Sequence, residues 1–171
     1  LKKNITNKKI KFPVVVKPIN EGSSLGVKVC KNNKILISET KKLFKKYNQL
    51  IFEEYIRGQE IQVAVINGNS LGAIELIPKR FFYDYKAKYT KAAKTEHVMP
   101  AKLKKNKYYE VLKIAKKVHK VLGCRGVTRS DFKFYKNRFN LLEINTQPGM
   151  TNLSLVPEIA RYKGVSFENL V

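Results

Sequence analysis

The sequence contains no tryptophan, only two cysteines and only 13 acidic residues among its 171. Cysteines as far apart as Cys30 and Cys124 form neither a disulfide framework nor a zinc site, which fits a reducing, cytoplasmic location. No apolar run approaches the roughly 20 residues that a membrane-spanning helix needs. Hydrophobic residues still make up 43% of the chain, so we expect a folded core rather than a disordered polypeptide.

Positive charge dominates the composition. The 35 basic residues give a formal net charge of +22, which first suggests nucleic acid or an anionic membrane as a partner. However, 29 of them are Lys and only 6 are Arg, the residue preferred for bidentate phosphate and base recognition. We therefore interpret the lysines as solvated surface charge and expect no nucleic acid and no membrane partner. A lysine-rich nucleic-acid-binding module remains the alternative.

Hydrophobic periodicity predicts an α+β fold with mostly antiparallel sheets and flanking helices. The predicted strands are 12–17, 27–30, 50–56, 61–66, 71–77, 127–134 and 139–144, and the predicted helices are 41–48, 108–122 and 155–162. Asn67-Gly68 predicts a hairpin turn, and Gly123 predicts a helix end. Residues 81–97 have no clean period and predict a long, functional loop. A boundary between two lobes is predicted near Arg57-Gly58, dividing 1–57 from 58–171.

A turn-rich loop follows the first predicted strand, which ends at Lys17. The loop contains Gly22, Ser23, Ser24 and Gly26. Backbone N–H groups and hydroxyls of such a loop can surround a phosphate, and Lys17 would supply a cation. An ordinary strand–turn–strand with an extended surface lysine explains the same residues equally well, so both interpretations stay open.

Two predicted strands near the carboxyl end carry polar residues at a spacing of two, Arg129 with Asp131 and Glu143 with Asn145. This spacing places both members of each pair on one face of a strand. The oxygen donors of Asp131, Glu143 and Asn145 suit Mg²⁺ held between carboxylates and nucleotide phosphates. Arg129 could bind a carboxylate or a transferring phosphoryl group. A surface ladder of ion pairs is the alternative, and we favour the metal site.

Four more polar residues are candidates at nucleotide positions. Glu53 and Glu60 flank the lobe boundary, where a carboxylate can accept hydrogen bonds from ribose hydroxyls. Lys88 and Tyr89 could close over phosphates as part of a lid. His119, on a lysine-rich helix, is expected to be solvated.

Five motifs in order cover nearly the whole chain. They are Phe-Pro-Val-Val-Val-Lys-Pro with Glu-Gly-Ser-Ser-Leu-Gly (12–26), Phe-Tyr-Asp-Tyr-Lys-Ala-Lys-Tyr (82–89), Gly-Val-Thr-Arg-Ser-Asp (126–131), Leu-Leu-Glu-Ile-Asn-Thr-Gln-Pro-Gly-Met-Thr (141–151) and Ser-Leu-Val-Pro (154–157). Together they closely resemble the D-alanine–D-alanine ligase family, ATP-grasp enzymes of peptidoglycan precursor synthesis.

The resemblance implies ATP-dependent ligation of two D-alanines through an acyl-phosphate, in the cytoplasm, for cell-wall biogenesis and cell shape. It implies ATP and two Mg²⁺ ions as cofactors, with Mn²⁺ as a substitute, and a homodimeric full-length enzyme. Residues 1–57 would be part of the ATP-grasp central domain, and 58–171 its carboxy-terminal domain with loop 81–97 over the active site. No counterpart of the family's amino-terminal α/β domain is present, so we expect a fragment that is inactive by itself. Another ATP-grasp carboxylate–amine ligase, such as a D-alanine–D-lactate ligase, is the alternative.

The resemblance also implies a role for each matching residue. For ATP, it implies phosphate, adenine and ribose contacts from Lys17, Glu53, Tyr55, Ile56, Glu60, Phe82, Lys88 and Leu142. For Mg²⁺, it implies the ligands Asp131, Glu143 and Asn145. For the reacting groups, it implies that Ser23 and Tyr89 order the loop and substrate, and that Arg129 and the Gly149 backbone stabilise the phosphorylated intermediate. Ser154 and Leu155 would bind the carboxylate of the second D-alanine.

Overall fold

The computed structural model describes residues 11–22, 24–78 and 95–171. The described residues form two compact units that divide between Tyr55 and Ile56. Unit 1 contains the described residues up to 55, and unit 2 contains 56–78 and 95–171. Ser23, Phe82, Lys88 and Tyr89, which sequence analysis assigned to the site, lie outside the described residues.

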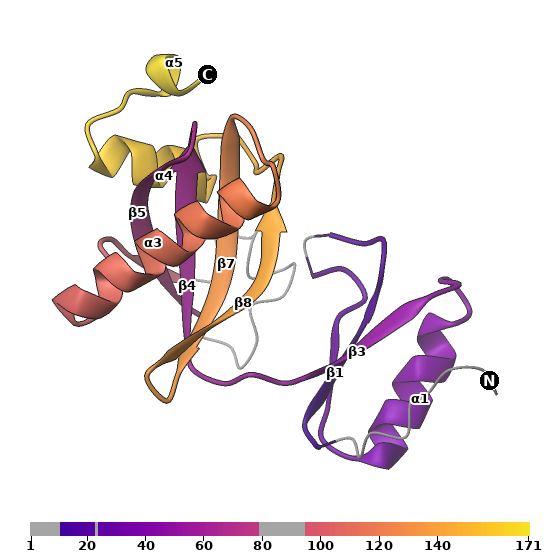
Figure 1. Cartoon of the computed structure of the whole chain (residues 1–171). Helices are drawn as coiled ribbons and strands as arrows, with labels where there is room; N and C mark the ends of the chain where they lie inside the picture. The colour runs from indigo at the N-terminus through magenta and orange to yellow at the C-terminus, as the bar shows by residue number, and fades with distance from the viewer. Residues whose placement is uncertain (1–10, 23, 79–94) are drawn as a thin grey trace. The chain divides into compact units, whose positions relative to one another are not determined.

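Unit 1 is a small antiparallel sheet with one helix (Figure 1). Its strands β1 (Val14–Pro18), β2 (Lys28–Cys30) and β3 (Leu50–Glu54) lie in the order β2-β1-β3. Alternate residues of β1 are buried, and Val14 and Val16 pack in a core with Cys30 and with Leu36 and Leu43 of the helix. The residues between them face the other side of the sheet, where β1 presents Lys17.

Helix α1 (Asn33–Leu43) corrects the predicted helix 41–48. It begins earlier because the Asn32 side chain caps it, accepting a hydrogen bond from the Ile35 N–H at 3.0 Å. Leu36, Thr40 and Leu43 follow at helical spacing and are buried. The predicted range overlaps the helix only at 41–43, because it missed the Asn32 cap and the buried positions Leu36 and Thr40 that come before it.

Unit 2 contains a five-stranded antiparallel sheet in the order β6-β5-β4-β7-β8. The strands are β4 (Gln59–Ile66), β5 (Asn69–Ile77), β6 (Glu96–Val98), β7 (Val127–Tyr135) and β8 (Arg138–Asn145). Helix α3 (Lys105–Val121) lies across the strands in Figure 1, and α4 (Leu155–Tyr162) and α5 (Phe167–Leu170) complete the unit. The α+β prediction with mostly antiparallel strands is confirmed.

Two tight turns set the register of this sheet. Asn67 and Gly68 join β4 to β5, and both have positive φ (47° and 75°), as a type I′ hairpin requires. Lys136 and Asn137 join β7 to β8, also with positive φ (47° and 64°). The predicted loop 81–97 is wrong at its end, because Glu96 and His97 pair with β5 as part of β6.

The main core lies between α3 and one face of the sheet. Ile61, Val63 and Phe132 pack there with Val111 and Ala115 of the helix. His119 continues this buried helix face and is only 4% exposed. Its Nδ1 lies 2.9 Å from the Thr128 hydroxyl oxygen, so the expectation that His119 is solvated was wrong. No helix in the described ranges is long and apolar enough to cross a membrane.

Candidate functional site

Four predicted residues meet on the face of β7 and β8. Asp131 pairs with Glu143 across the two strands, and Arg129 pairs with Asn145. Nε and Nη2 of Arg129 donate to the two carboxylate oxygens of Asp131 at 2.8 and 2.9 Å. Nδ2 of Asn145 donates to Oε1 of Glu143 at 3.5 Å. The structure therefore brings these side chains together in one cluster, the β7–β8 patch.

The donor set of the β7–β8 patch fits a hard dication, because it offers carboxylate and amide oxygens from neighbouring strands. Within the described residues there is no group of three or more His, Cys, Asp or Glu side chains arranged for a metal. The patch has two carboxylates, with Asn145 supplying the third oxygen. Both Asp131 oxygens are held by Arg129, so a cation and the guanidinium would compete for this carboxylate.

A bulge in β8 affects how Leu142 is placed. Phe132 pairs with Leu141 while Asp131 pairs with Glu143, which leaves Leu142 as the extra residue. In a regular strand, consecutive side chains point to opposite faces, so Leu142 and Glu143 would be separated. The bulge breaks this alternation, so the side chains of both residues can lie on the same face of the sheet. Sequence spacing gave no signal for it.

Glu60 forms the second ion pair of this sheet. It lies directly across from Lys133 on β4 and β7, and the Lys133 ammonium donates to Oε2 of Glu60 at 2.9 Å. The two side chains are only 14% and 18% exposed. Sequence analysis singled out Glu60 and missed Lys133. The alternation of Arg129, Asp131 and Lys133 along β7 was the signal that could have identified it.

In unit 1, Lys17 pairs with Glu53. The Lys17 ammonium lies 2.8 Å from Oε2 of Glu53 on the sheet face that α1 does not cover. In the following loop, the Leu25 N–H donates to the Gly22 carbonyl, and the Val27 N–H donates to the Ser24 carbonyl. These two donors are thus used within the loop. A Cβ on Gly26 would lie 2.8 Å from the Pro18 ring, so the close packing of the loop requires glycine there.

Tyr55 and Ile56 directly follow β3 in the chain. The Tyr55 N–H donates to the Pro13 carbonyl at 3.0 Å, which continues the β1–β3 pairing. Tyr55 belongs to unit 1, and Ile56 is the first residue of unit 2. Both side chains are partly buried.

Ser154 organises the loop before α4. Its hydroxyl oxygen accepts a hydrogen bond from the Thr151 N–H at 3.0 Å and lies 2.9 Å from the Thr151 hydroxyl. A Cβ on Gly149 would lie 2.9 Å from this hydroxyl, so Gly149 passes close to Ser154. Leu155 starts α4, and its side chain is buried. Amino ends of helices favour anions, which makes this loop suitable for a carboxylate. Sequence analysis did not single out Thr151.

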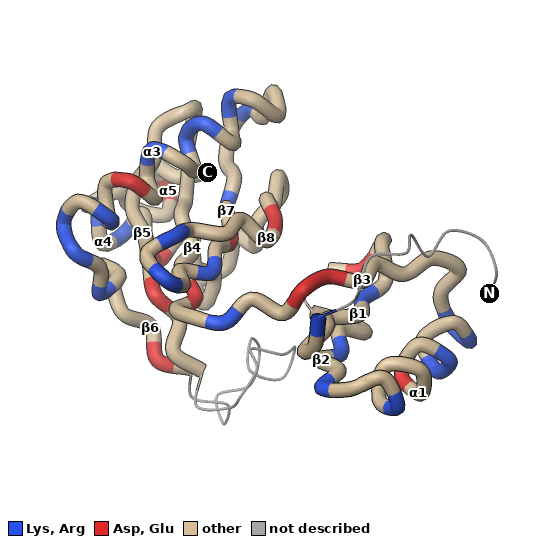
Figure 2. The backbone as a smooth tube through the Cα atoms, turned by 60° about the horizontal axis from the view of Figure 1, so that its bottom comes forward, with Lys and Arg blue, Asp and Glu red and all other residues tan. Residues whose placement is uncertain are grey.

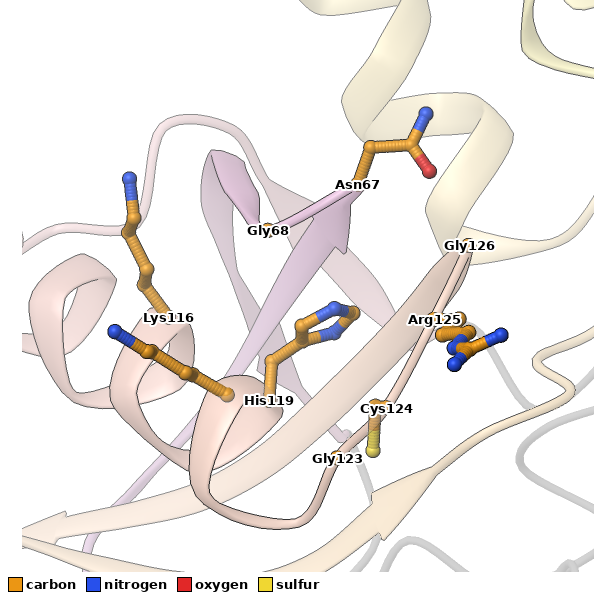
Figure 3. A pocket seen from close by; sticks show the side chains of 9 residues that line it. Asn67, Gly68, Lys116, His119, Gly123, Cys124, Arg125 and Gly126 are labelled. Atoms are coloured by element: carbon orange, nitrogen blue, oxygen red, sulfur yellow. The ribbon is translucent and has the colours of Figure 1, made fainter.

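A depression of about 780 Å³ lies at the far end of β4 from Glu60. It is lined by the Asn67-Gly68 turn, the end of α3 and residues 123–126. Figure 3 shows Lys116 and Arg125 on opposite sides, pointing away from each other. None of the predicted site residues lines it, and its cations do not converge.

The basic residues are not gathered on one element. Figure 2 shows Lys and Arg distributed over both units, whereas β3 stands out by its two adjacent acidic residues. This distribution agrees with the interpretation of the lysines as dispersed surface charge.

Comparison with known proteins gives one consistent family. The family model described as D-ala D-ala ligase C-terminus matches residues 2–171. The D-alanine–D-alanine ligase of Pelagibacter ubique (strain HTCC1062) is 58% identical over 167 residues, covering 98% of this chain and 54% of the relative. That of Geotalea uraniireducens (strain Rf4) is 44% identical over 161 residues, covering 94% and 52%.

Solved structures agree with this result. The D-alanine–D-alanine ligase of Bacillus anthracis complexed with ATP has a TM-score of 0.77 at 32% identity, covering 93% of this chain and 51% of that one. The VanG D-Ala:D-Ser ligase of Enterococcus faecalis has a TM-score of 0.81 at 28% identity, covering 94% and 48%. The chain spans about half the length of the curated relatives it matches. On its family match, its sequence identity and its fold, the chain belongs to the D-ala D-ala ligase C-terminus family.

Proposed function

We propose that the protein takes part in the ATP-dependent ligation of two D-alanines to D-alanyl-D-alanine. The observation that carries the proposal is the β7–β8 patch, an arginine and three oxygen donors on one sheet face, in a chain of this family. In the reaction, the γ-phosphoryl group of ATP is transferred to the carboxylate of the first D-alanine. The amine of the second then attacks the acyl carbon, loses a proton and expels phosphate.

The β7–β8 patch handles the charge of the phosphoryl group in this proposal. Asp131, Glu143 and Asn145 would hold Mg²⁺, or Mn²⁺ in its place, and the bound ion would supply neutralising charge at the phosphate oxygens. Arg129 leaves its contact with Asp131 to neutralise the phosphorylated intermediate, together with the Gly149 backbone. The bidentate geometry of the pair supports this role, because the same planar fork fits two phosphate oxygens.

The loop before α4 binds the second D-alanine. The Ser154 hydroxyl, oriented by Thr151, and the Leu155 N–H at the helix start contact its carboxylate. With both substrates held, proximity supplies much of the acceleration. We further propose that Ser23, Lys88 and Tyr89 order and cover the reacting groups, which excludes water from the acyl-phosphate.

For ATP, we propose phosphate contacts from Lys17, a ribose contact from Glu60 and adenine contacts from Glu53, Tyr55, Ile56, Phe82 and Leu142. The ion-paired Lys17 and the polar face of β4 and β7 support the first two roles. We also propose a cytoplasmic, homodimeric full-length enzyme that serves cell-wall synthesis, on the strength of the family.

The test is an assay of the protein expressed from the complete reading frame. We expect phosphate release that depends on D-alanine and ATP, with one phosphate for each dipeptide formed. D-lactate and D-serine are offered as second substrates, because the fold is also that of a D-Ala:D-Ser ligase. No release, or equal release with unrelated carboxylates, contradicts the proposal. Tight duplex binding that falls steeply with salt would instead support the nucleic-acid alternative.

Arg129→Lys sharpens this assay. Lysine keeps the positive charge but lacks the two parallel N–H donors of the guanidinium group, so kcat should fall by roughly 100-fold or more. Arg138→Lys, at the exposed start of β8, is the matched control and should leave kcat unchanged. Equal kcat values for the two variants would remove Arg129 from the reaction.

A further inference from the structure

Lys133 has no role in the proposed reaction, yet it makes one of the two most buried ion pairs of unit 2 among the described residues. Its ammonium donates to Oε2 of Glu60 at 2.9 Å, and the two side chains are 18% and 14% exposed. The residues are direct partners across β4 and β7, so the sheet register itself brings them together. Oε1 of Glu60 has no partner among the described residues.

The charged residues of β7 on this face form two pairs. Arg129, Asp131 and Lys133 alternate along the same face of β7. Arg129 binds both oxygens of Asp131, so Asp131 is already compensated on that side. Lys133 is therefore the cation that compensates Glu60. The strand β8 adds only Asn140 opposite Lys133, and its Nδ2 donates to the Lys133 carbonyl at 3.3 Å.

A carboxylate at this depth needs a compensating donor, because removing one partner of a buried ion pair leaves an uncompensated charge. The bond to Oε2 also fixes the rotation of the Glu60 carboxylate. Oε1 then presents its lone pairs in a fixed direction as a charged hydrogen-bond acceptor. A neighbouring pair of hydroxyl donors is the chemistry that this acceptor suits.

We propose that Lys133 is a positioning residue for the sugar end of the nucleotide, which orients Glu60 so that Oε1 accepts from the ribose hydroxyls. The inference rests on the proposed function, in which Glu60 contacts the ribose, and it adds Lys133 as the residue that determines this contact. Lys133 itself touches no nucleotide.

The test compares ATP with 2′,3′-dideoxy-ATP, which lacks both ribose hydroxyls, by titration calorimetry on the protein expressed from the complete reading frame. Hydrogen bonds to a charged acceptor predict that the wild type binds ATP at least about tenfold more tightly than the dideoxy analogue. Lys133→Met should weaken ATP binding and leave the analogue unchanged, so that the ratio of the two affinities falls to about one. Lys133→Arg, which keeps a charged donor, should retain most of the ratio.

Lys107→Met is the matched control. Lys107 pairs with Glu110 at 2.7 Å and is 15% exposed, but lies on α3 away from the polar sheet face. The ratio of the affinities for ATP and 2′,3′-dideoxy-ATP should be the same in Lys107→Met as in the wild type. If Lys133→Met does not fold, Lys133→Gln, which can still donate to Glu60, carries the test and should give an intermediate ratio.

The outcomes separate this inference from the proposed function. A wild-type ratio retained in Lys133→Met or Lys133→Gln overturns the inference, as does an equal loss of both nucleotides, which indicates a purely structural lysine. If the wild-type protein binds ATP and 2′,3′-dideoxy-ATP equally tightly, the inference is also overturned, but the ligase proposal stays intact. A wild type that binds neither nucleotide contradicts the proposed function itself.

Discussion

The two units each use a Lys–Glu pair on the face of a sheet, but in different surroundings. The pairs Lys17–Glu53 and Lys133–Glu60 are equally short, at 2.8 and 2.9 Å. Glu53 is 42% exposed, whereas Glu60 is 14% exposed. Water screens the first pair and can replace either partner, while the second pair has little access to water. Equal geometry therefore does not mean equal contribution to stability.

The hydrophobic core of unit 1 is also smaller than that of unit 2. The buried cluster of unit 1 consists of Val14, Val16, Cys30, Leu36 and Leu43. Unit 2 packs a larger cluster between a five-stranded sheet and α3, with α4 adding further buried side chains. Small units bury a smaller fraction of their surface and are less stable. The stable framework for charged groups is therefore in unit 2.

The largest difference is expected when a carboxylate is neutralised in each unit. Asp131→Asn removes one charge of the most buried described pair, so the free energy of unfolding of unit 2 should fall by about 3 kcal/mol. Glu53→Gln should lower that of unit 1 by only about 0.5 kcal/mol. Urea denaturation measures both values.

Glu143→Gln is the control for Asp131→Asn, because Glu143 lies directly across from Asp131 but is exposed. Its effect should resemble that of Glu53→Gln. Similar losses for Asp131→Asn and Glu53→Gln would show that burial does not separate the two kinds of pair.

A smaller difference is expected in amide hydrogen exchange. The β1 amides of Val14 and Val16 should exchange at least about tenfold faster than the β4 amides of Ile61 and Val63, because the smaller core of unit 1 opens at a lower free energy. Both sets lie in paired antiparallel strands, which controls for local hydrogen bonding. Equal protection would mean that the units open together as one cooperative structure.

Sequence spacing predicted which residues of the candidate site share a strand face. Arg129 and Asp131, or Glu143 and Asn145, share a face because every second residue of a strand does. The hairpin turn at Asn67-Gly68 could be predicted in the same way, because few residues other than Asn and Gly adopt positive φ easily. These features are local, so one sequence is enough to predict them.

What spacing could not predict depends on contacts between distant residues. The partner of Glu60 is 73 residues away, and only the register of β4 and β7 makes Lys133 that partner. His119 is buried because Thr128 offers its hydroxyl on a neighbouring strand, which the lysine-rich helix sequence does not reveal. The bulge at Leu142 likewise arises from pairing with β7.

The smallest expected effect concerns the labelling rates of the two thiols. Cys30 reports on the interior of unit 1, and Cys124 reports on the surface of unit 2. Cys30 is fully buried in the unit 1 core, and burial, followed by the nearby Glu39 carboxylate, raises the pKa of its thiol above 9.0. Cys124 is partly exposed after α3. Because the thiolate is the reactive form, iodoacetamide at pH 8 should label Cys124 first and Cys30 at least about tenfold more slowly.

The same raised pKa fixes the sign of a pH effect. Above pH 9.0 the unfolded Cys30 thiol releases its proton while the folded thiol still holds it, so its contribution to stability falls as the pH rises through this window. Cys124→Ser leaves Cys30 as the sole thiol, and its labelling rate then reports the opening of unit 1 directly. A rate close to that of a free thiol would show that the unit 1 core is open much of the time. Division of the labelling rate by that of a free thiol gives an opening free energy for unit 1. A value above the opening free energy of the β4 amides would show that unit 1 is the more stable unit, which would reverse the comparison.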